Sequence, residues 1–455
     1  MDGTELVAAV RRGDAEAVAA LLEAGAAPDT VTDDGLPVLC LAVAAHDAAV
    51  AGALVEGGAD PDRRLLDGTT PLVRAVDGGS PAVADAVLGR EPRLRLPEAE
   101  RERLLALARH WYERGAEGEL RCRTGASGPA RQARVMDDEY HHVTRLTLGG
   151  LTVRAGHGAI LTDLEWAFRI LTPVDELVAR AVAHGDPDHV DWSSARWVLS
   201  ERRSKETWSA VTAYRHDPDP EHRRFVLEVL HWYLMCPSSR RNSYEEDTAE
   251  LLVAWATEGE EDPGVLAEVL RVLSETGHRE SEAVGLRHAG HPDPRVRARV
   301  PDILLGWDTP RPPLGAAARA ALLVLAGDED RGVRAGAGGA LIAAHDGSSE
   351  FTDLIVGLLR DPVADVRACT AEAVADGADR TAAVADALVA LLDEDDLVTR
   401  LNAAYGLFRR DDPRTGQAIE RVGPLPRPGF EHDHRLSAFR RWKWDRENPS
   451  AAAEQ

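Results

Sequence analysis

The residues best suited to metal chemistry lie close together in the first half of the chain. His141 and His142 directly follow the acidic run 137–139, and His157 comes shortly after them. Imidazole and carboxylate groups are ligands that zinc accepts. The spacing matches no established metal motif, so these three histidines are only candidate ligands. The alternative is a polar hairpin that closes the join between two parts of the chain.

A second group of residues is suited to binding a protein. The segment 435–444 is basic and aromatic in a chain that is otherwise acidic. Arginine and tryptophan are over-represented among the residues that dominate binding energy at interfaces. The alternative is a helix that docks on the last structural repeat. The partner-binding candidates of this segment are Phe439, Arg440, Arg441, Trp442 and Trp444.

The sequence carries none of the common catalytic motifs. It has no GxGxxG before a helix, no P-loop, no GxSxG elbow and no HExxH pair. No catalytic residue and no cofactor-binding residue can therefore be assigned, and no cofactor is expected. The sequence leaves enzymatic activity open and favours a non-catalytic protein.

Composition and charge restrict the class of partner. The chain has 455 residues, of which 44% are hydrophobic and 5% aromatic, and its formal net charge is −24. Binding to a phosphate backbone needs a positive surface, so nucleic acid is not the expected partner. A basic partner protein fits the charge, and solubility alone is the alternative explanation.

The cysteines and the chain start favour a cytoplasmic location. The four cysteines are far apart and form no CxxC pair, which fits a reducing compartment. The first residues show no basic region followed by an apolar run, so a signal peptide is not expected. No run is long and apolar enough to predict a membrane span. The cysteines are Cys40, Cys122, Cys236 and Cys369.

A period of 33 residues governs the N-terminal part of the chain. Leu6, Leu39 and Leu72 follow this step, and Gly25 returns as Gly58. A fixed period of this size predicts stacked helical units, each of which buries its apolar face against its neighbours.

The segment Gly68-Thr69-Thr70-Pro71-Leu72 resembles the start of the first helix in ankyrin repeats. Thr70 can cap this helix, Pro71 suits its first turn, and Leu72 faces the core. The middle repeat departs from the pattern because Pro37 comes one position early, which predicts a distorted first turn. A degenerate fourth helix pair is expected over residues 98–115. The resemblance implies protein binding.

The region that follows the 33-residue repeats is less helical in its sequence pattern. Residues 124–129 read as a loop, and two β-prone runs, 143–148 and 151–154, flank the pair Gly149-Gly150. This pattern predicts a β-hairpin. Trp166, Trp192 and Trp197 are expected to pack in an interdomain core, and exposed binding aromatics are the alternative.

A second repeat governs the C-terminal part. Arg297, Arg334, Arg367 and Arg400 are separated by steps of 37, 33 and 33 residues, and three of them follow a valine. The segment Asp361–Arg367 with the helix after it resembles the short HEAT-like repeats named after phycobilisome lyases. The resemblance implies that these arginines form a structural polar ladder; a row of ligand-binding arginines is the alternative. The acidic runs 328–330 and 393–396 are expected to be solvated helix starts.

These features together predict an all-α protein, a tandem helical-repeat solenoid with a small β-hairpin insertion at the junction. Residues 1–118 are assigned to ankyrin-like repeats, 119–170 to the junction with the hairpin, 171–425 to HEAT-like repeats, and 426–455 to the basic aromatic segment and tail. Residues 310–313 are expected to lengthen one connection, and disorder is expected after Asn448.

The leading functional hypothesis is a non-catalytic scaffold or adaptor that binds a protein, with a basic protein as one option and self-association through the C-terminal segment as another. The alternative is a HEAT-fold enzyme, because bilin lyases and alkylpurine DNA glycosylases share that fold. A lyase would need a tetrapyrrole pocket. A glycosylase would need a basic groove with a recessed aspartate and tryptophan.

Overall fold

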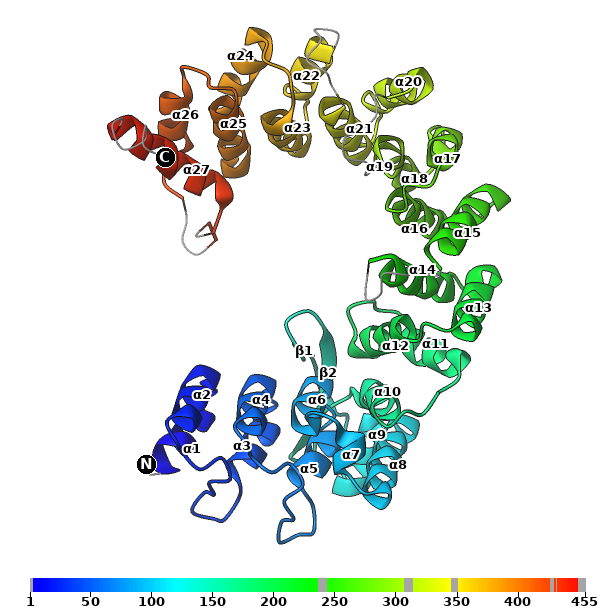
Figure 1. The fold of residues 1–455 in the computed structure, drawn as a ribbon, viewed down its shortest axis with the longest axis vertical. Helices are drawn as coiled ribbons and strands as arrows, with labels where there is room; N and C mark the ends of the chain where they lie inside the picture. The colour runs from blue at the N-terminus through cyan, green and yellow to red at the C-terminus, as the bar shows by residue number, and fades with distance from the viewer. Residues whose placement is uncertain are drawn as a thin grey trace. The chain divides into compact units, whose positions relative to one another are not determined.

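The computed structural model describes residues 3–235, 244–306, 314–344, 351–425, 429–430 and 432–448. The chain is mostly helical and is built as a repeat solenoid with one small sheet, as the sequence predicts (Figure 1). It forms two compact units, Met1–Met235 and Cys236–Gln455. Each unit has its own core. The finer division at residues 118, 170 and 425 stays a prediction.

The first unit begins with three helix pairs. Equivalent helices of successive pairs pack side by side, α1 on α3 on α5 and α2 on α4 on α6. Leu6, Leu39 and Leu72 are each at most 2% exposed, so the residues of the 33-residue period form the core. The helices are α1 (Gly3–Arg12), α2 (Ala15–Glu23), α3 (Val38–Ala45), α4 (Ala48–Glu56), α5 (Pro71–Gly78) and α6 (Pro81–Leu88).

The first turns of helices α5 and α3 differ because proline takes a different position in each. Thr70 caps α5 by accepting a hydrogen bond from the Val73 N–H at 3.2 Å, and Pro71 occupies the first turn. In the middle repeat, Pro37 takes the capping position, and no side chain caps α3. Both helices are 8 residues long, so the displaced proline removes the cap and leaves the helix intact.

The predicted fourth helix pair is wrong. Residues Glu98–Arg114 form one continuous helix, α8, because no turn residue interrupts its 17 helix-forming positions. It follows the short α7 (Pro92–Arg95) and precedes α9 (Ala116–Thr124). Leu104, Ala108 and Trp111 are its buried face.

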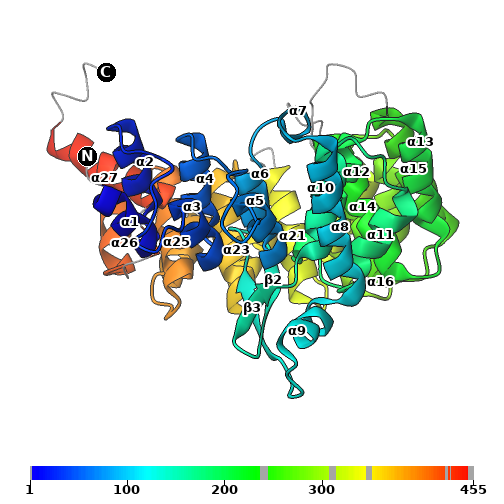
Figure 2. The same ribbon diagram turned by 90° about the horizontal axis from the view of Figure 1, so that it is seen from below.

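The junction contains a three-stranded antiparallel sheet, β1 (Arg131–Met136), β2 (His142–Leu148) and β3 (Leu151–Arg154), in that order. The predicted hairpin is confirmed, with Leu148 opposite Leu151. Strand β1 was not predicted, because its exposed run of basic and small residues lacks β-branched alternation. Leu146, Leu148 and Val153 join Trp111 and Leu120 in a small core that holds the sheet against α8 and α9 (Figure 2).

The rest of the first unit is helical. Helix α10 packs against α6, α8 and α12, and α12 packs against α11 and α14. The elements are α10 (His157–Ala167), α11 (Val174–Val182), α12 (Val190–Glu201), α13 (Lys205–Ala213), the single turn η1 (Tyr214–His216) and α14 (Pro220–Met235).

The second unit is a row of helical repeats. Helices α21, α23 and α25 pack side by side, and each contacts a helix of a second row, α20, α22 or α24. In the repeat before them, the helix is broken into α18 and α19 just ahead of Pro301. The elements are α15 (Glu245–Glu258), α16 (Pro263–Ser274), α17 (Ser281–His288), α18 (Pro294–Arg297), α19 (Val300–Leu305), α20 (Ala316–Leu325), α21 (Arg331–Ala343), α22 (Thr352–Leu358), α23 (Ala364–Asp376), α24 (Ala382–Leu391), α25 (Leu397–Arg409), α26 (Thr415–Val422) and α27 (His434–Glu447).

Some expectations fall outside the described residues. These are the connection at 310–313, the thiol of Cys236 and the tail after Asn448. Within the described ranges, no helix has the length and apolar character needed to cross a membrane.

Candidate binding groove and arginine ladder

A groove of about 340 Å³ opens in the first unit. Its walls are α6, α10 and α12, and two residues of the turn between β1 and β2 also line it. Cavities of this size are typical of sites for small ligands or single side chains. The lining residues that could contact a ligand through charge or aromatic rings are Asp85, Asp138, His141, Asp163, Trp166 and Trp197. We call this cavity the acidic groove.

Buried carboxylates fix the walls of the acidic groove. Asp137, in the β1–β2 turn, accepts hydrogen bonds from the Ser80 hydroxyl at 2.6 Å and the Ala82 N–H at 2.8 Å. It also binds the Arg154 guanidinium at 2.6 Å. The sheet therefore holds the start of α6, and Asp137 supplies the negative charge that a helix N-terminus favours.

A second carboxylate joins α12 to α10. Asp191 Oδ1 accepts the Ala159 N–H at 2.6 Å, near the start of α10. A Cβ at Gly158 would lie 2.9 Å from both Asp191 carboxylate oxygens, so only glycine leaves room for this contact. The two helices that form most of the groove are thus held at their N-terminal ends.

The tryptophans do not all behave as predicted. Trp192 is fully buried and packs edge-to-face on Phe225, as expected for a core residue. Trp197 is 47% exposed, and its ring lies 6.2 Å from that of Trp166 at the acidic groove. For Trp197 the core prediction is wrong, because this part of α12 faces the cavity. The Arg169 guanidinium lies 5.6 Å from the centre of the Trp166 ring, in a cation–π contact.

Two carboxyl groups of the acidic groove have raised pKa values. Burial raises the pKa of Asp163 to about 7, and the negative charge of Asp85 adds to the shift. The Ser194 hydroxyl donates a hydrogen bond to Asp163 at 3.2 Å and opposes the shift. Partial burial raises the pKa of Asp85 as well. A cation placed between these groups would favour the ionised form of Asp163.

The lining of the acidic groove is suited to a cation. Among the described residues that line it there are three aspartates and one histidine, and there is no arginine or lysine. A recessed aspartate and tryptophans are present, as a glycosylase-type site requires. The basic residues that a DNA-binding groove needs are absent from this described lining.

The structure does not bring the three candidate metal histidines to one place. His141 pairs with Asp138 at 2.9 Å, and His142 pairs with Asp186 at 2.9 Å. His157 is buried and stacks on Trp111 with ring centres 4.6 Å apart. Each imidazole therefore already has a partner of its own. None of the three belongs to the one group of potential metal ligands found among the described residues.

The C-terminal candidates separate into buried and exposed residues. Phe439 is 4% exposed and packs on Tyr405 and Phe408 of α25. It is therefore a core residue and is unavailable to a partner, as expected for a docked helix. Trp442 is partly covered and lies under the Arg446 guanidinium at 4.8 Å. The exposed candidates are Arg440, Arg441 and Trp444.

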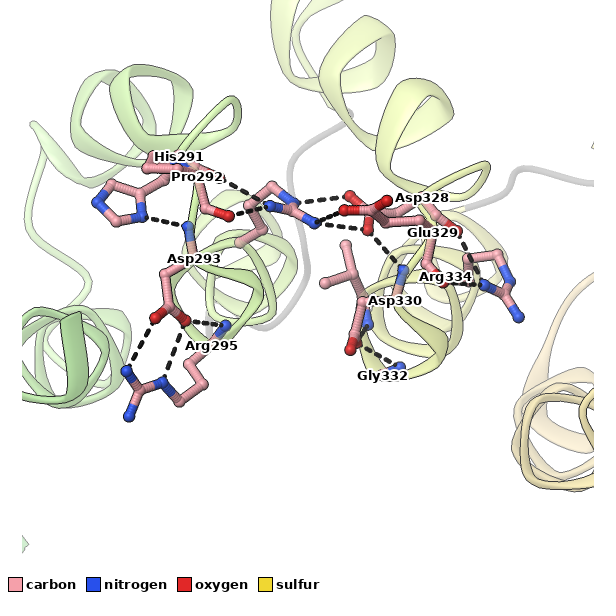
Figure 3. A network of polar contacts seen from close by, with 11 residues as sticks. His291, Pro292, Asp293, Arg295, Asp328, Glu329, Asp330, Gly332 and Arg334 are labelled. Atoms are coloured by element: carbon pink, nitrogen blue, oxygen red, sulfur yellow. Dashed lines mark hydrogen bonds and ion pairs between the residues drawn. The ribbon is translucent and has the colours of Figure 1, made fainter.

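The repeated arginines of the second unit bind acids of the next repeat. Arg297 binds Asp328 through two hydrogen bonds of 2.7 and 2.8 Å, and Arg334 binds Asp361 through two of 2.8 and 3.0 Å. Arg367 binds Glu394 at 2.7 Å. Figure 3 shows the contacts around Asp328 and Arg334. We call these three pairs the arginine ladder.

Each ladder arginine also fixes its own preceding turn. Arg334 Nη1 donates to the carbonyl oxygens of Asp328 and Glu329 at 2.8 and 3.0 Å. Arg297, Arg367 and Arg400 make the same two contacts, five and six residues back in the chain. At the C-terminal end the ladder stops, and Arg400 meets the Val422 carbonyl oxygen at 3.4 Å.

The acidic runs have two roles. Asp330 and Asp396 cap α21 and α25, as predicted for helix starts. Asp328 is instead a largely buried acceptor of the arginine ladder, and the Arg297 guanidinium lowers its pKa. A sequence signal for the ladder exists in retrospect. Asp328, Asp361 and Glu394 each precede an arginine by six residues.

Comparisons with known proteins support one of the two resemblances. Residues 6–95 match the family model for ankyrin repeats, in three copies. This part of the chain therefore consists of ankyrin repeats, and it covers the three helix pairs α1–α6 except for the first residues of α1. Ankyrin repeats indicate a role in protein–protein interaction.

The other comparisons are weaker. A crystal structure of YibA from E. coli is similar, with 16% sequence identity and a TM-score of 0.41. The match covers 55% of this chain and 92% of that chain. No curated protein is significantly similar in sequence.

Proposed function

We propose that this chain is a protein-interaction scaffold and that its acidic groove captures a cationic side chain of a basic partner protein. The observation that carries the proposal is the groove's lining, two interacting carboxylates, Asp85 and Asp163, beside the exposed ring of Trp197. Carboxylates and aromatic faces are the two groups that recognise guanidinium and ammonium ions.

The whole-chain charge supports this choice of partner. A net charge of −24 attracts basic proteins over a distance and accelerates their encounter. The neighbouring contact between Arg169 and Trp166 shows a guanidinium already placed on one ring of the groove. A DNA glycosylase activity is disfavoured by the same acidic lining.

The second unit has a supporting role in the proposal. We infer that it consists of HEAT-like repeats, which the paired helices and the arginine ladder support. In this reading Arg297, Arg334, Arg367 and Arg400 are structural, since their guanidinium groups already bind acids or carbonyl oxygens. The exposed residues Arg440, Arg441 and Trp444 form a second binding surface or a self-association surface. Free thiols at Cys40, Cys122 and Cys369 fit a cytoplasmic protein.

Selection from random displayed peptides tests the proposal. The full chain is the bait, and variants Asp163→Asn and Trp197→Ala are used in parallel. We expect the selected peptides to contain arginine or lysine and to lose binding to both variants. Matched controls are Asp33→Asn, which removes the same charge from an exposed turn, and Trp232→Ala, which removes a ring that is 36% exposed on α14.

Selected peptides without a basic residue would overturn the proposal. So would peptides that bind Asp163→Asn and Trp197→Ala as tightly as the natural chain. Peptides lost equally in the control variants would show that total charge, and not the acidic groove, determines binding.

A further inference from the structure

We propose that His184, His189 and Asp191 form a structural binding site for a divalent transition-metal ion of the zinc type. The three residues come from the loop after α11 and the start of α12. Their ligand atoms all lie within 4.8 Å of one another. This site is separate from the three histidines that the sequence pattern singled out.

The distances between the donor atoms fit one ion. His184 Nε2 lies 3.2 Å from Asp191 Oδ2, and His189 Nδ1 lies 3.8 Å from the same oxygen. His189 Nδ1 also accepts the Asp191 N–H at 3.2 Å, and an ion bound to Nδ1 would replace this long hydrogen bond. Ligands at 2.0–2.2 Å from a tetrahedral zinc ion are about 3.4 Å apart. Two imidazoles and a carboxylate leave the fourth position for water. Nitrogen and oxygen donors of this kind suit zinc, cobalt or nickel better than calcium or magnesium.

The carboxylate is already oriented for this role. Asp191 Oδ1 accepts the Ala159 N–H, so Oδ2 remains for the two histidines. His184 and His189 lie against each other with ring centres 3.9 Å apart. The three groups therefore lie close enough together to contact one ion.

The opposite edge of the His189 ring, away from the proposed ligand atom Nδ1, is also buried. His189 is 2% exposed, and its Nε2 atom has no hydrogen-bond partner among the described residues. His142 is 6% exposed, and its Nδ1 atom also has none. The two rings are 5.6 Å apart. Buried polar atoms are rarely left unsatisfied, and the two nitrogens of an imidazole point in different directions. A buried water, and not the ion on His189 Nδ1, is therefore expected beside these two atoms.

The supports around the cluster resemble those of metal sites. His142 Nε2 pairs with Asp186 at 2.9 Å, and the His142 N–H donates to the Asp188 carbonyl oxygen at 2.9 Å. These contacts fix the loop to β2. Carboxylates that orient neighbouring imidazoles are common around bound ions. An ion here would join the α11–α12 loop to the carboxylate that caps α10.

Titration of the full chain with Zn²⁺ and Co²⁺ tests the site. We expect one ion per chain in calorimetry, a higher melting temperature with Zn²⁺, and visible Co²⁺ absorption bands. His184→Ala removes an exposed ligand with little effect on folding. Asp191→Asn keeps an oxygen for the Ala159 N–H. Each change should weaken ion binding at least about tenfold. The control His216→Ala removes an exposed histidine of η1 outside the cluster and should leave the affinity for the ion unchanged.

Three outcomes would overturn the proposal. The first is the absence of binding by the folded chain at micromolar ion concentrations. The second is unchanged affinity in both His184→Ala and Asp191→Asn. The third is a loss of binding in His216→Ala that equals the loss in His184→Ala.

Discussion

Asp163 is the residue on which the chemistry of the acidic groove depends. It lies among apolar side chains of α10 and α12, and burial raises its pKa to about 7. In the unfolded chain the same carboxyl group titrates near 3.8. The folded state therefore binds more protons than the unfolded state between these two values, and stability falls as the pH rises through this window.

Replacing Asp163 with asparagine should stabilise the fold in a pH-dependent way. Above pH 7 the variant avoids a buried charge, and we expect a gain of about 2 kcal/mol after allowance for partial exposure. The gain should shrink toward pH 5. Urea unfolding at several pH values measures it. A variant less stable than the natural chain at pH 8 would contradict the assigned pKa.

Gly79 lies where the last ankyrin repeat contacts the end of strand β3. Its φ angle is +74°, and a Cβ there would lie 1.8 Å from the Arg154 carbonyl oxygen. Gly79→Ala should cost at least about 3 kcal/mol, through backbone strain and this clash. Thermal and urea unfolding measure the loss.

Gly25→Ala is the matched control, because Gly25 has a φ of +94° and nothing within 4 Å of the added Cβ. It should cost only about 1 to 2 kcal/mol from the left-handed backbone. Equal losses at the two positions would show that the close approach at Gly79 contributes nothing.

At the scale of elements, the arginine ladder determines how successive helices of the second unit are joined. Removing the Arg334 guanidinium leaves Asp361 without its bidentate partner, and Asp361 has a side chain only 7% exposed. Arg334→Met keeps the aliphatic stem and should cost about 2 to 4 kcal/mol. The Arg334 guanidinium lowers the pKa of Asp361, so its contribution should be present above pH 4 and decline as acid protonates Asp361.

Arg331→Met is the control for the ladder. Arg331 pairs with Asp365 across the same two helices, but both side chains are more than 60% exposed. Its loss should cost less than about 1 kcal/mol. If urea unfolding gives equal losses for Arg331→Met and Arg334→Met, the ladder has no special structural role.

Phe439 is the buried aromatic residue of helix α27 at its contact with α25. Phe439→Ala removes the side chain that packs on Tyr405 and Phe408 and should destabilise the second unit by about 3 kcal/mol.

Trp444→Ala, at a position 44% exposed, should change stability by less than about 0.5 kcal/mol. Solution mass of Trp444→Ala tests self-association. A large stability loss in Trp444→Ala would contradict the placement of α27.

The elements were predictable where a local pattern determines them. The 33-residue period and the Thr70-Pro71 start predicted the ankyrin helices, and Gly149-Gly150 predicted the hairpin turn. Strand β1 was missed because pairing with β2, and not its own residues, makes it a strand. Helix α8 was predicted as a helix pair because the ankyrin pattern was extended to residues 98–115, where the sequence has no turn residues to separate two helices.

At the scale of the whole molecule, the acidic groove could not be predicted. Its walls come from α6, the β1–β2 turn, α10 and α12, which lie far apart in the sequence. No single one of these segments carries a sequence motif for a binding site. In the sequence, Asp85 and Asp163 resemble solvent-exposed helix residues. The exposure of Trp197 could not be predicted either, because a tryptophan in a helical repeat is more often a core residue.

The net charge and the acidic groove give the molecule a common preference for cations. The first acts at a distance and favours encounter with basic proteins, while the second selects a single side chain. If the groove captures a cation, binding must ionise Asp163 and release protons near neutral pH. Cation binding in the acidic groove and proton release from Asp163 are therefore thermodynamically coupled.

Calorimetric titration of the full chain with an arginine peptide tests this claim most directly. The peptide has one arginine flanked by alanines, and its control carries citrulline, which has the same shape and no charge. We predict that the arginine peptide binds and the citrulline peptide does not. Affinity should rise up to about tenfold from pH 6 to pH 8, and Asp163→Asn should abolish this rise. Equal binding of both peptides, or a pH dependence that survives in Asp163→Asn, would contradict the account.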